Sequence, residues 1–266
     1  MYFADLHLHS RCSPDGKYSI SQMAAAGAAA GLSELCVTDH CDLLDVTGQV
    51  ARPFDLAPLE AEFLDAVPQK GVKVRFGLEL GEAPEDCSEA EKITSHPRLD
   101  FVIGSLHNLS RKMGGKDYYY IEYSSEALCY QYLNDYMDQM EKLALLDCYD
   151  VLGHIIYPLR FMRDRDRRDV HLERYWDRLR MILQTAAQKN KGIELNTNRG
   201  RSLGEWLPIL RMFLACGGEI VTVGSDAHRP EDVGKGVKDA YALLREAGFR
   251  YVCVFEKRKA QFLSLA

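Results

Sequence analysis

The stretch Phe-Val-Ile-Gly-Ser-Leu-His at residues 101–107 is a short apolar run that ends directly on a histidine. Short runs of this kind, rich in β-branched residues and bounded by polar positions, are typical of buried strands. Seven further runs of the same character occur along the chain: Tyr2–Leu8, Glu34–Thr38, Val72–Leu80, Asp150–Gly153, Gly192–Leu195, Ile220–Val223 and Tyr251–Val254. The sequence therefore predicts strands distributed over the whole chain.

Segments with the apolar spacing of helices separate these runs. They are Ser21–Ala30, Leu56–Val67, Ser125–Leu146, Leu172–Lys189, Leu203–Ala215 and Val237–Ala247. Strands that alternate with helices indicate a parallel α/β sheet, and seven or eight such units in 266 residues favour a closed barrel over an open sheet. No repeat or low-complexity linker divides the chain, so we expect one domain over residues 1–266, with long loops at Gly81–Pro97 and Tyr157–His171.

Composition excludes several classes of function. Lys and Arg total 33 against 39 Asp and Glu, and the resulting net charge of −6 argues against a general nucleic-acid-binding surface. No stretch approaches the roughly 20 apolar residues of a membrane-spanning helix, and the first residues lack the pattern of a signal peptide. The eight cysteines are scattered and form no C-x-x-C pair, as expected of reduced thiols in the cytoplasm. We therefore expect a cytoplasmic protein with no nucleic-acid or membrane partner, and its oligomeric state is left open.

The positions of the histidines carry most of the functional information. Six of the eight end or follow a predicted strand: His7, His9, His40, His107, His154 and His228. Three carboxylates, those of Asp15, Glu79 and Asp226, lie at or just past the same places. The carboxyl ends of barrel strands meet at one rim, where the active sites of such barrels lie, so the nine groups should converge. His96 and His171 lack this placement, and we expect both at the surface.

Two readings of these histidines compete. A single histidine at a strand end is most often a hydrogen-bonded core or rim residue. Nine titratable groups aimed at one rim, however, are hard to satisfy without a metal, because buried unpaired carboxylates are costly. The i, i+2 spacing also puts His7 and His9 on one face of their strand, with Leu6 and Leu8 pointing outward under the helices.

Other polar residues beside the strands are assigned supporting roles. Asp5, Asp39 and Asp100 are expected to fix loops or to orient the ligand histidines. The serines next to the candidate ligands have no evident activating base, so we expect them to be hydrogen-bonding residues of the loops; they are Ser10, Ser105 and Ser225.

The ordered set of motifs resembles one known family. D-x-H-x-H, S-x-D-G, T-D-H, a strand Glu, G-S-x-H, G-H and S-D-A-H, which run from His7 to His228, resemble the polymerase-and-histidinol-phosphatase (PHP) phosphoesterases. Residues 101–107, 150–154 and 194–200 look most like the stand-alone histidinol-phosphate phosphatases of that family. One departure is Asn-Thr-Asn-Arg-Gly at 196–200, where relatives commonly carry Asn-Thr-Ser-Gly.

The resemblance implies a fold and a set of metal ligands. The fold would be a distorted, TIM-like (β/α)7 barrel of the PHP type, whereas the strand count alone leaves seven and eight strands open. Two or three divalent ions would be bound, the first by His7, His9, Glu79 and Asp226. Glu79 would bridge to a second ion held by His107 and His154, and a third ion would be held by Asp15, His40 and His228.

The chemistry of these ligands points the same way. Mixed histidine and carboxylate ligation suits Zn²⁺, Mn²⁺ or Fe²⁺. Three such ions with three carboxylates leave a net positive site that attracts a phosphate dianion. Neighbouring metals acidify bound water, so a metal-bound hydroxide can attack phosphorus without a covalent nucleophile. We assign Asp226, His228 and Arg160 to catalysis.

Arginines are expected to hold the phosphate, because a guanidinium matches phosphate oxygens. Arg160, six residues past His154, is the first candidate, and Arg199 is the second, with Arg201 as its competitor. The neighbouring arginines alternate with aspartates and are expected to form a solvated face; they are Arg163, Arg165, Arg167 and Arg168.

The residues and the resemblance leave three functions to be weighed. The first is a phosphomonoesterase of histidine biosynthesis that hydrolyses L-histidinol phosphate to L-histidinol and phosphate, with Asp42 and Asp45 as candidate acceptors for the cationic part of the substrate. The second is a related phosphoesterase that acts on nucleotides or other small phosphate esters. A non-catalytic metal-binding domain is the third, although such a domain would be expected to lose ligands.

Overall fold

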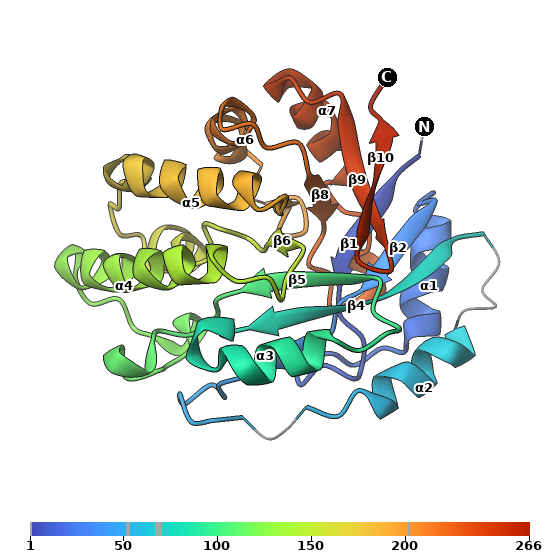
Figure 1. Ribbon diagram of the computed structural model, residues 1–266, viewed down its shortest axis with the longest axis horizontal. Helices are drawn as coiled ribbons and strands as arrows, with labels where there is room; N and C mark the ends of the chain where they lie inside the picture. Colours follow the sequence, from blue (N-terminus) through green and yellow to red (C-terminus); the bar gives the residue numbers. More distant parts are fainter. Residues whose placement is uncertain (1, 52–53, 67–70, 202) are drawn as a thin grey trace.

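The fold is built around one parallel sheet that nearly closes on itself (Figure 1). The computed structural model describes residues 2–51, 54–66, 71–201 and 203–266. The sheet order is β1-β2-β4-β5-β6-β7-β8, and every neighbouring pair is parallel. The strands are β1 (Ala4–Leu8), β2 (Glu34–Val37), β4 (Lys73–Gly81), β5 (Phe101–Ser105), β6 (Val151–Leu152), β7 (Gly192–Asn196) and β8 (Val221–Gly224).

The two ends of the sheet meet at the segment that follows β8. Asp226 N donates to His7 O at 2.8 Å, and His9 N donates to Ala227 O at 2.8 Å. The short strand β3 (His40–Asp42) follows β2 in the chain and pairs with the end of β4, with His40 opposite Glu79. The barrel therefore has seven strand positions, as the family resemblance implied.

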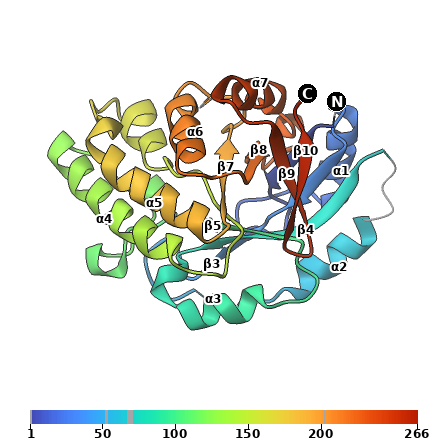
Figure 2. The ribbon, with the colours of Figure 1, turned by 45° about the horizontal axis from the view of Figure 1, so that its top comes forward.

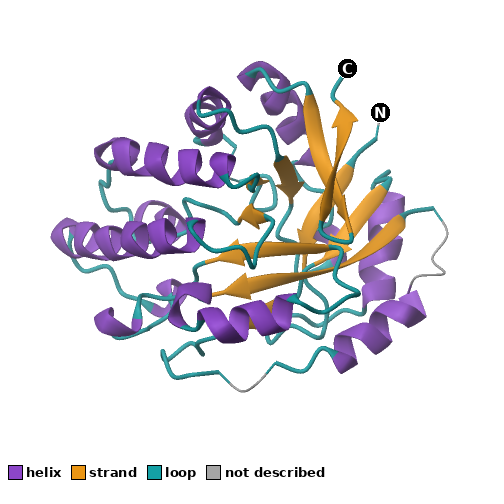
Figure 3. Cartoon of the chain, in the orientation of Figure 1, coloured by secondary structure: helices purple, strands orange, loops and turns teal. Residues whose placement is uncertain are grey.

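Helices cover the outside of the barrel (Figure 3). They are α1 (Ile20–Ala29), α2 (Ala57–Ala66), α3 (Cys87–Thr94), α4 (Glu126–Ala144), α5 (Trp176–Gln188), α6 (Trp206–Ala215) and α7 (Val237–Ala247). The short 3-10 helices are η1 (Ala83–Glu85), η2 (Arg111–Met113), η3 (Tyr118–Tyr120), η5 (Leu172–Tyr175) and η6 (Pro230–Asp232). The six predicted helices are confirmed to within a few residues, except that Val67 lies outside the described residues.

Neither of the two predicted long loops is free of regular structure. Helix α3 lies inside Gly81–Pro97, where the Asp86 side chain caps it by accepting from Glu89 N at 3.0 Å. Its buried face consists of Ala90, Ile93 and Thr94, which is too small an apolar signal to indicate a helix. The second loop contains one π-helical segment, η4 (Arg160–Arg165), which directs polar side chains toward the carboxyl rim.

The run Tyr251–Val254 is not a barrel strand. It belongs to β9 (Tyr251–Glu256), which pairs antiparallel with β10 (Lys259–Ser264) in a separate hairpin. Figure 2 shows this hairpin beside β4, near both chain termini. Its residues Cys253, Val254 and Phe255 pack with Ala4, Leu6, Cys36, Phe101, Ile103 and Val151. The hairpin therefore fills the amino-terminal end of the barrel, opposite the histidines.

A β-bulge in β1 corrects the prediction for Leu6. Asp5 pairs with Leu35 and Leu8 pairs with Val37, so β1 has one more residue than β2 over this span. The extra residue changes the alternation of side chains. Leu6 joins the cluster at the amino-terminal end of the barrel, whereas Leu8 packs with the larger core that includes Ile20 and Met23 of α1. The expectation that both leucines point outward is right for Leu8 and wrong for Leu6.

Candidate metal centre

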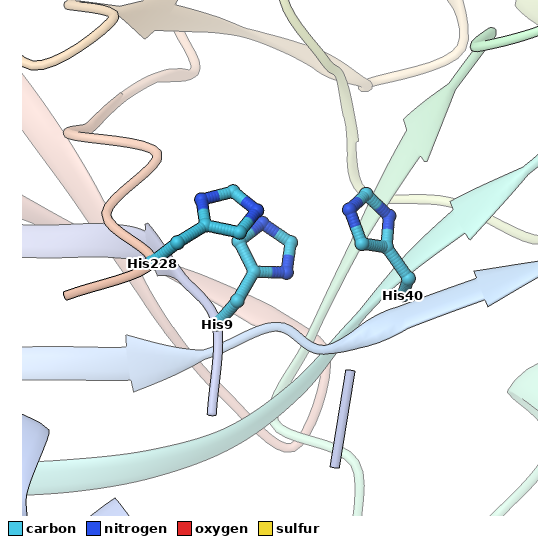
Figure 4. A group of neighbouring side chains, drawn as sticks. All are labelled: His9, His40 and His228. Atoms are coloured by element: carbon cyan, nitrogen blue, oxygen red, sulfur yellow. The ribbon is translucent and has the colours of Figure 1, made fainter. Parts of the chain in front are cut away.

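The nine predicted residues converge at the carboxyl-terminal rim of the barrel. His7 and His9 come from β1 and the residue after it, Asp15 from the turn that follows, His40 from β3, and Glu79 from β4. His107 follows β5, His154 follows β6, and Asp226 and His228 follow β8. Figure 4 shows His9, His40 and His228 gathered from three of these segments. His96 and His171 lie elsewhere, beside Glu60 and Asp169 respectively.

Glu79 is the centre of the cluster. Its Oε1 lies 2.7 Å from His154 Nε2 and 3.1 Å from His107 Nε2. Its Oε2 lies 3.2 Å from His7 Nε2 and 3.1 Å from His40 Nδ1. With 1% of its surface exposed, this carboxylate faces different histidines with each oxygen, as a bridging ligand must.

Two smaller groups lie on either side of Glu79. On one side, His7 Nε2 is 3.1 Å from His9 Nε2, and Asp226 Oδ1 is 3.7 Å from His9 Nε2. On the outer side, Asp15 Oδ2 is 2.9 Å from His228 Nε2 and 3.8 Å from His40 Nε2. The His9 ring stacks against the rings of both His40 and His228, with centroids 4.3 and 4.1 Å away.

The charges of the cluster are strongly coupled. Burial alone would raise the pKa of Glu79, but His7, His107 and His40 hold that pKa well below its usual value. Burial alone would lower the pKa of His7, yet Glu194, Glu79 and Asp226 hold it well above the usual value. Burial and the neighbouring His228 and His40 lower the pKa of His9. The carboxylates are thus held ionised, which is the state that ligates a cation.

The donor atoms fit divalent metal ions. Imidazole nitrogens face each other in two places, His7 Nε2 with His9 Nε2 and His107 Nε2 with His154 Nε2 at 3.3 Å. Two lone pairs this close repel unless a proton or a cation lies beside them. Four groups of three side chains place their ligand atoms within 4.8 Å of one another: His9–His40–His228, His7–His9–Glu79, His40–Asp42–His107 and Glu79–His107–His154.

Several residues behind the cluster orient its histidines, and the sequence reasoning missed part of this set. Glu194 Oε1 lies 2.6 Å from His7 Nδ1, and Ser13 Oγ lies 3.1 Å from His9 Nδ1 while donating to Asp39. Asp42 Oδ1 lies 3.0 Å from His107 Nδ1, the ring nitrogen that does not face Glu79, so Asp42 orients this histidine. No role was predicted for Glu194 or Ser13. An acidic residue inside a strand run, as in Gly192–Leu195, was the signal available for Glu194.

The supporting residues predicted from the sequence lie in different places. Asp39 accepts from Ser10 and Ser13 beside the cluster, and Ser105 donates to Glu79 at 2.7 Å. Asp5 accepts from the backbone of Ser225 and Gly234. The prediction for Asp100 is right about fixing a loop, but it holds the hairpin turn by accepting from Lys257 N, far from the histidines. Asp45 caps its own turn through Thr47 and Gln49.

A cavity of about 650 Å³ opens over the cluster. Arg160 lines it and donates to Asp226 Oδ2 at 2.8 Å and to Asn196 Oδ1 at 2.6 Å. Arg199 also lines it and donates to Asn198, and Arg201 lines it as well. The rings of Tyr119, Tyr157 and Phe161 also line the cavity, and of these Tyr157 lies nearest the cluster, with its ring centroid 4.7 Å from that of His154.

Three of the arginines after Arg160 do more than face solvent, which corrects the prediction for Arg163, Arg165 and Arg168, whereas Arg167 is exposed as expected. Arg163 donates to Val170 O and pairs with Glu205. Arg168 donates to Tyr123 O, and Arg165 donates to the carbonyls of Tyr119 and Ile121. Guanidinium groups have several donors in a fixed fork, so they can join carbonyls of separate loops. These bonds shape the wall of the cavity.

The fold and the site are those that the family resemblance implied: a parallel seven-stranded barrel of the PHP type, with a cluster of histidines and carboxylates at its carboxyl rim. The protein's family follows from a direct match: the profile of the PHP domain covers residues 5–198, and the chain belongs to this family. Among the described residues, none of the helices is long and apolar enough to cross a bilayer. The eight cysteines, all within the described part of the chain, are free thiols.

Relatives match over almost the whole chain. A protein of Clostridium acetobutylicum named "probable histidinol-phosphatase" is 28% identical, with 97% of this chain and 98% of the relative covered. The histidinol-phosphatase of Lactococcus lactis is 27% identical, with 96% and 95% covered. The crystal structure of histidinol phosphate phosphatase from Lactococcus lactis, complexed with zinc, L-histidinol and phosphate, superposes with a TM-score of 0.78 at 25% identity, with 97% of this chain and 98% of that chain covered.

Proposed function

We propose that this protein is a metal-dependent phosphatase that hydrolyses L-histidinol phosphate to L-histidinol and phosphate. The observation that carries the proposal is the convergence of nine histidine and carboxylate side chains beneath a cavity lined by arginines. Relatives of matching length support it, because two are named histidinol-phosphatases or probable ones, and one was crystallised with zinc, L-histidinol and phosphate.

The ligand residues divide into three overlapping sets. His7, His9, Glu79 and Asp226 would hold one ion, and Glu79, His107 and His154 a second. Asp15, His40 and His228 would hold a third, with two or three ions of Zn²⁺, Mn²⁺ or Fe²⁺ in total. When bound, such ions polarise phosphoryl oxygens and bring the pKa of water toward neutrality.

The protein's own residues bind and orient the phosphate. Arg160 is fixed by Asp226 and Asn196, so its guanidinium keeps its position at the floor of the cavity before substrate arrives. Arg199 supplies a second cation from the loop after β7, where it lines the cavity while donating to Asn198. The two arginines that line the cavity would hold the phosphoryl group against the cluster and stabilise its developing charge.

We assign proton transfer to Asp226 and His228, which follow β8. Asp226 Oδ1 and His228 face the same space, 3.8 Å apart, and His228 is also held by Asp15. Asp226 can accept the proton of the attacking water at Oδ1. His228 can hold a proton at Nδ1, which lies 3.1 Å from the backbone oxygen of Asp226, and this leaves Nε2, the atom that faces Asp15, for ligation.

The aromatic wall fits the leaving group. Phe161 contacts both Tyr157 and Tyr119 edge to face, with centroids 5.0 and 5.7 Å from its own. The three rings therefore form a continuous surface that begins beside the cluster at Tyr157. A planar imidazole packs well on such rings, and its cationic form gains from the negative ring faces. Asp164, which also lines the cavity, offers an acceptor for the amine.

A substrate panel tests this function. Phosphate release is measured from histidinol phosphate, nucleoside monophosphates and a nucleotide diester with the same metal-loaded protein. We expect the highest kcat/KM for histidinol phosphate. Efficient hydrolysis of nucleoside monophosphates, with none of histidinol phosphate, would replace the proposal by a nucleotide phosphoesterase.

A further inference from the structure

Glu194 is a buried carboxylate on the inner face of β7, with 1% of its surface exposed. Its Oε1 lies 2.6 Å from His7 Nδ1, and its Oε2 accepts from the backbone N of His154 at 3.0 Å. Asn196 Nδ2 lies 3.2 Å from both oxygens. A single side chain therefore holds two residues of the cluster that come from opposite sides of β7 in the strand order, β1 and β6.

The contact with His7 selects one tautomer. A carboxylate accepts hydrogen bonds, so the His7 ring carries its proton on Nδ1 and donates it to Glu194. In the neutral ring that ligates a cation, the lone pair is then on Nε2, which lies 3.1 Å from His9 Nε2 and 3.2 Å from Glu79 Oε2. Without this acceptor the proton could reside on Nε2, the atom needed for ligation.

The space behind His7 is shaped for this pair. A side chain on Gly224 would place its Cβ 2.3 Å from Glu194 Oε1 and 2.3 Å from His7 Cβ, which is closer than real contacts allow. The absence of a side chain at position 224 in β8 is what lets the carboxylate and the ring meet.

The same carboxylate is linked to the phosphate side of the cavity. Asn196 bonds Glu194 through its amide nitrogen, while its oxygen accepts from Arg160 at 2.6 Å and from Asn198 N at 2.8 Å. Arg160 in turn donates to Asp226. Glu194, Asn196, Arg160 and Asp226 thus form one hydrogen-bonded path.

We propose that Glu194 is a positioning residue of the metal centre: it fixes the tautomer of His7 and the backbone of His154, so that both Nε2 atoms face the bound ions. The inference rests on the proposed function in that the cluster binds metal. Partners of this kind behind a metal-bound histidine typically contribute about 10- to 100-fold in metal affinity.

The test is the zinc affinity of Glu194→Gln, measured by competition with a chromogenic chelator in the absence of substrate. Glutamine has the same size but one acceptor oxygen, so it cannot accept from both His7 and His154. We expect zinc to bind about 10- to 100-fold more weakly. The Nδ1 proton of His7, followed by NMR in histidine-labelled, zinc-loaded protein, should lose the low-field position that its 2.6 Å bond to a carboxylate produces.

Glu34→Gln is the matched control. Glu34 is equally buried and charged, but it pairs with Arg75 and Tyr2 at the other end of the barrel, so its zinc affinity should stay within about twofold of wild type. Glu194→Asp keeps the charge but shortens the side chain, so it should also lower zinc affinity. This variant serves as the test if Glu194→Gln folds poorly.

The outcomes separate this inference from the proposed function. Unchanged zinc affinity and an unchanged His7 resonance in both Glu194 variants would overturn the positioning role while leaving the phosphatase function intact. Wild-type protein that binds zinc but does not hydrolyse histidinol phosphate would overturn the function and leave the role of Glu194 standing.

Discussion

Glu79 lies within 3.2 Å of a ring nitrogen of four histidines, each from a different segment of the barrel. In the absence of cations, these contacts and the facing imidazole nitrogens would have to be balanced by shared protons alone. At the scale of single residues, this crowding is the strongest physical argument for bound metal, because it concentrates acceptor atoms in a buried place.

Removing a ligand atom should remove metal and activity together. In His9→Ala and Asp226→Ala, we expect turnover of histidinol phosphate to fall by more than the roughly 10- to 100-fold that loss of an outer partner causes. Metal content, measured by elemental analysis of the purified variants, should drop below that of wild type. Near-normal turnover in a variant stripped of metal would contradict the mechanism.

Arg160 should act on substrate rather than on metal retention. A lost charge-assisted hydrogen bond costs about 1.5–3 kcal/mol, so kcat/KM in Arg160→Ala should fall roughly ten- to over a hundredfold with the ions still bound. Arg211→Ala is the control, because Arg211 lies exposed on α6, away from the cavity. Unchanged kcat/KM at unchanged metal content would remove Arg160 from the site.

At the scale of elements, we expect the hairpin β9–β10 to contribute to the stability of the fold and not to its activity. Phe255 is 4% exposed and its ring lies 4.8 Å from that of Phe101, at the end of the barrel opposite the metal centre. Replacing a buried Phe by Ala typically costs about 3–5 kcal/mol through lost burial and the cavity left behind. The hairpin therefore contributes to the core without contacting the cluster.

The prediction is that Phe255→Ala loses about 3–5 kcal/mol of unfolding free energy in urea while its kcat at low temperature stays near that of wild type. Phe262→Ala, on the exposed strand of the same hairpin, should change stability by only ~0.5 kcal/mol. Equal effects of the two variants would show that the hairpin does not fill the barrel end.

The ion pair between Arg75 and Glu256 should depend on pH. Arg75, with help from Gln261, lowers the pKa of Glu256 from its ordinary 4.5 to about 2. A carboxyl group whose pKa is depressed by folding stabilises the fold fully above its unfolded pKa, and this contribution disappears as the pH falls through the folded pKa. Glu256→Gln should therefore be less stable than wild type above about pH 5 and match it near pH 2 in chemical denaturation. A constant difference over this range would exclude the pair as its source.

The elements also show what the sequence could predict. Strand-end histidines were readable because an apolar run followed by a polar residue marks both the strand and its carboxyl end. Helix α3 could not be predicted from the sequence, because Ala90 and Ile93 are too few apolar residues to produce a helical period. The bulge that turns Leu6 inward depends on pairing with β2, which no local pattern encodes. Glu194 looked like one more polar residue in a strand until the fold brought it against His7.

At the scale of the whole molecule, closure of the barrel explains how residues 220 positions apart become neighbours. Asp5 accepts from Ser225 N and His7 O accepts from Asp226 N, which joins the first strand to the segment after the last. The seven-stranded count needed the structure, because the break between β2 and β3 and the terminal hairpin are ambiguous in sequence. One domain over residues 1–266 and a cytoplasmic location stay predictions.

The most direct test of this account is the titration of metal-free wild-type protein with Zn²⁺ or Mn²⁺ while phosphate release from histidinol phosphate is followed. The account predicts negligible release before metal is added, and a rise that saturates at two or three ions per chain. Full activity in protein shown by elemental analysis to be free of metal would contradict it.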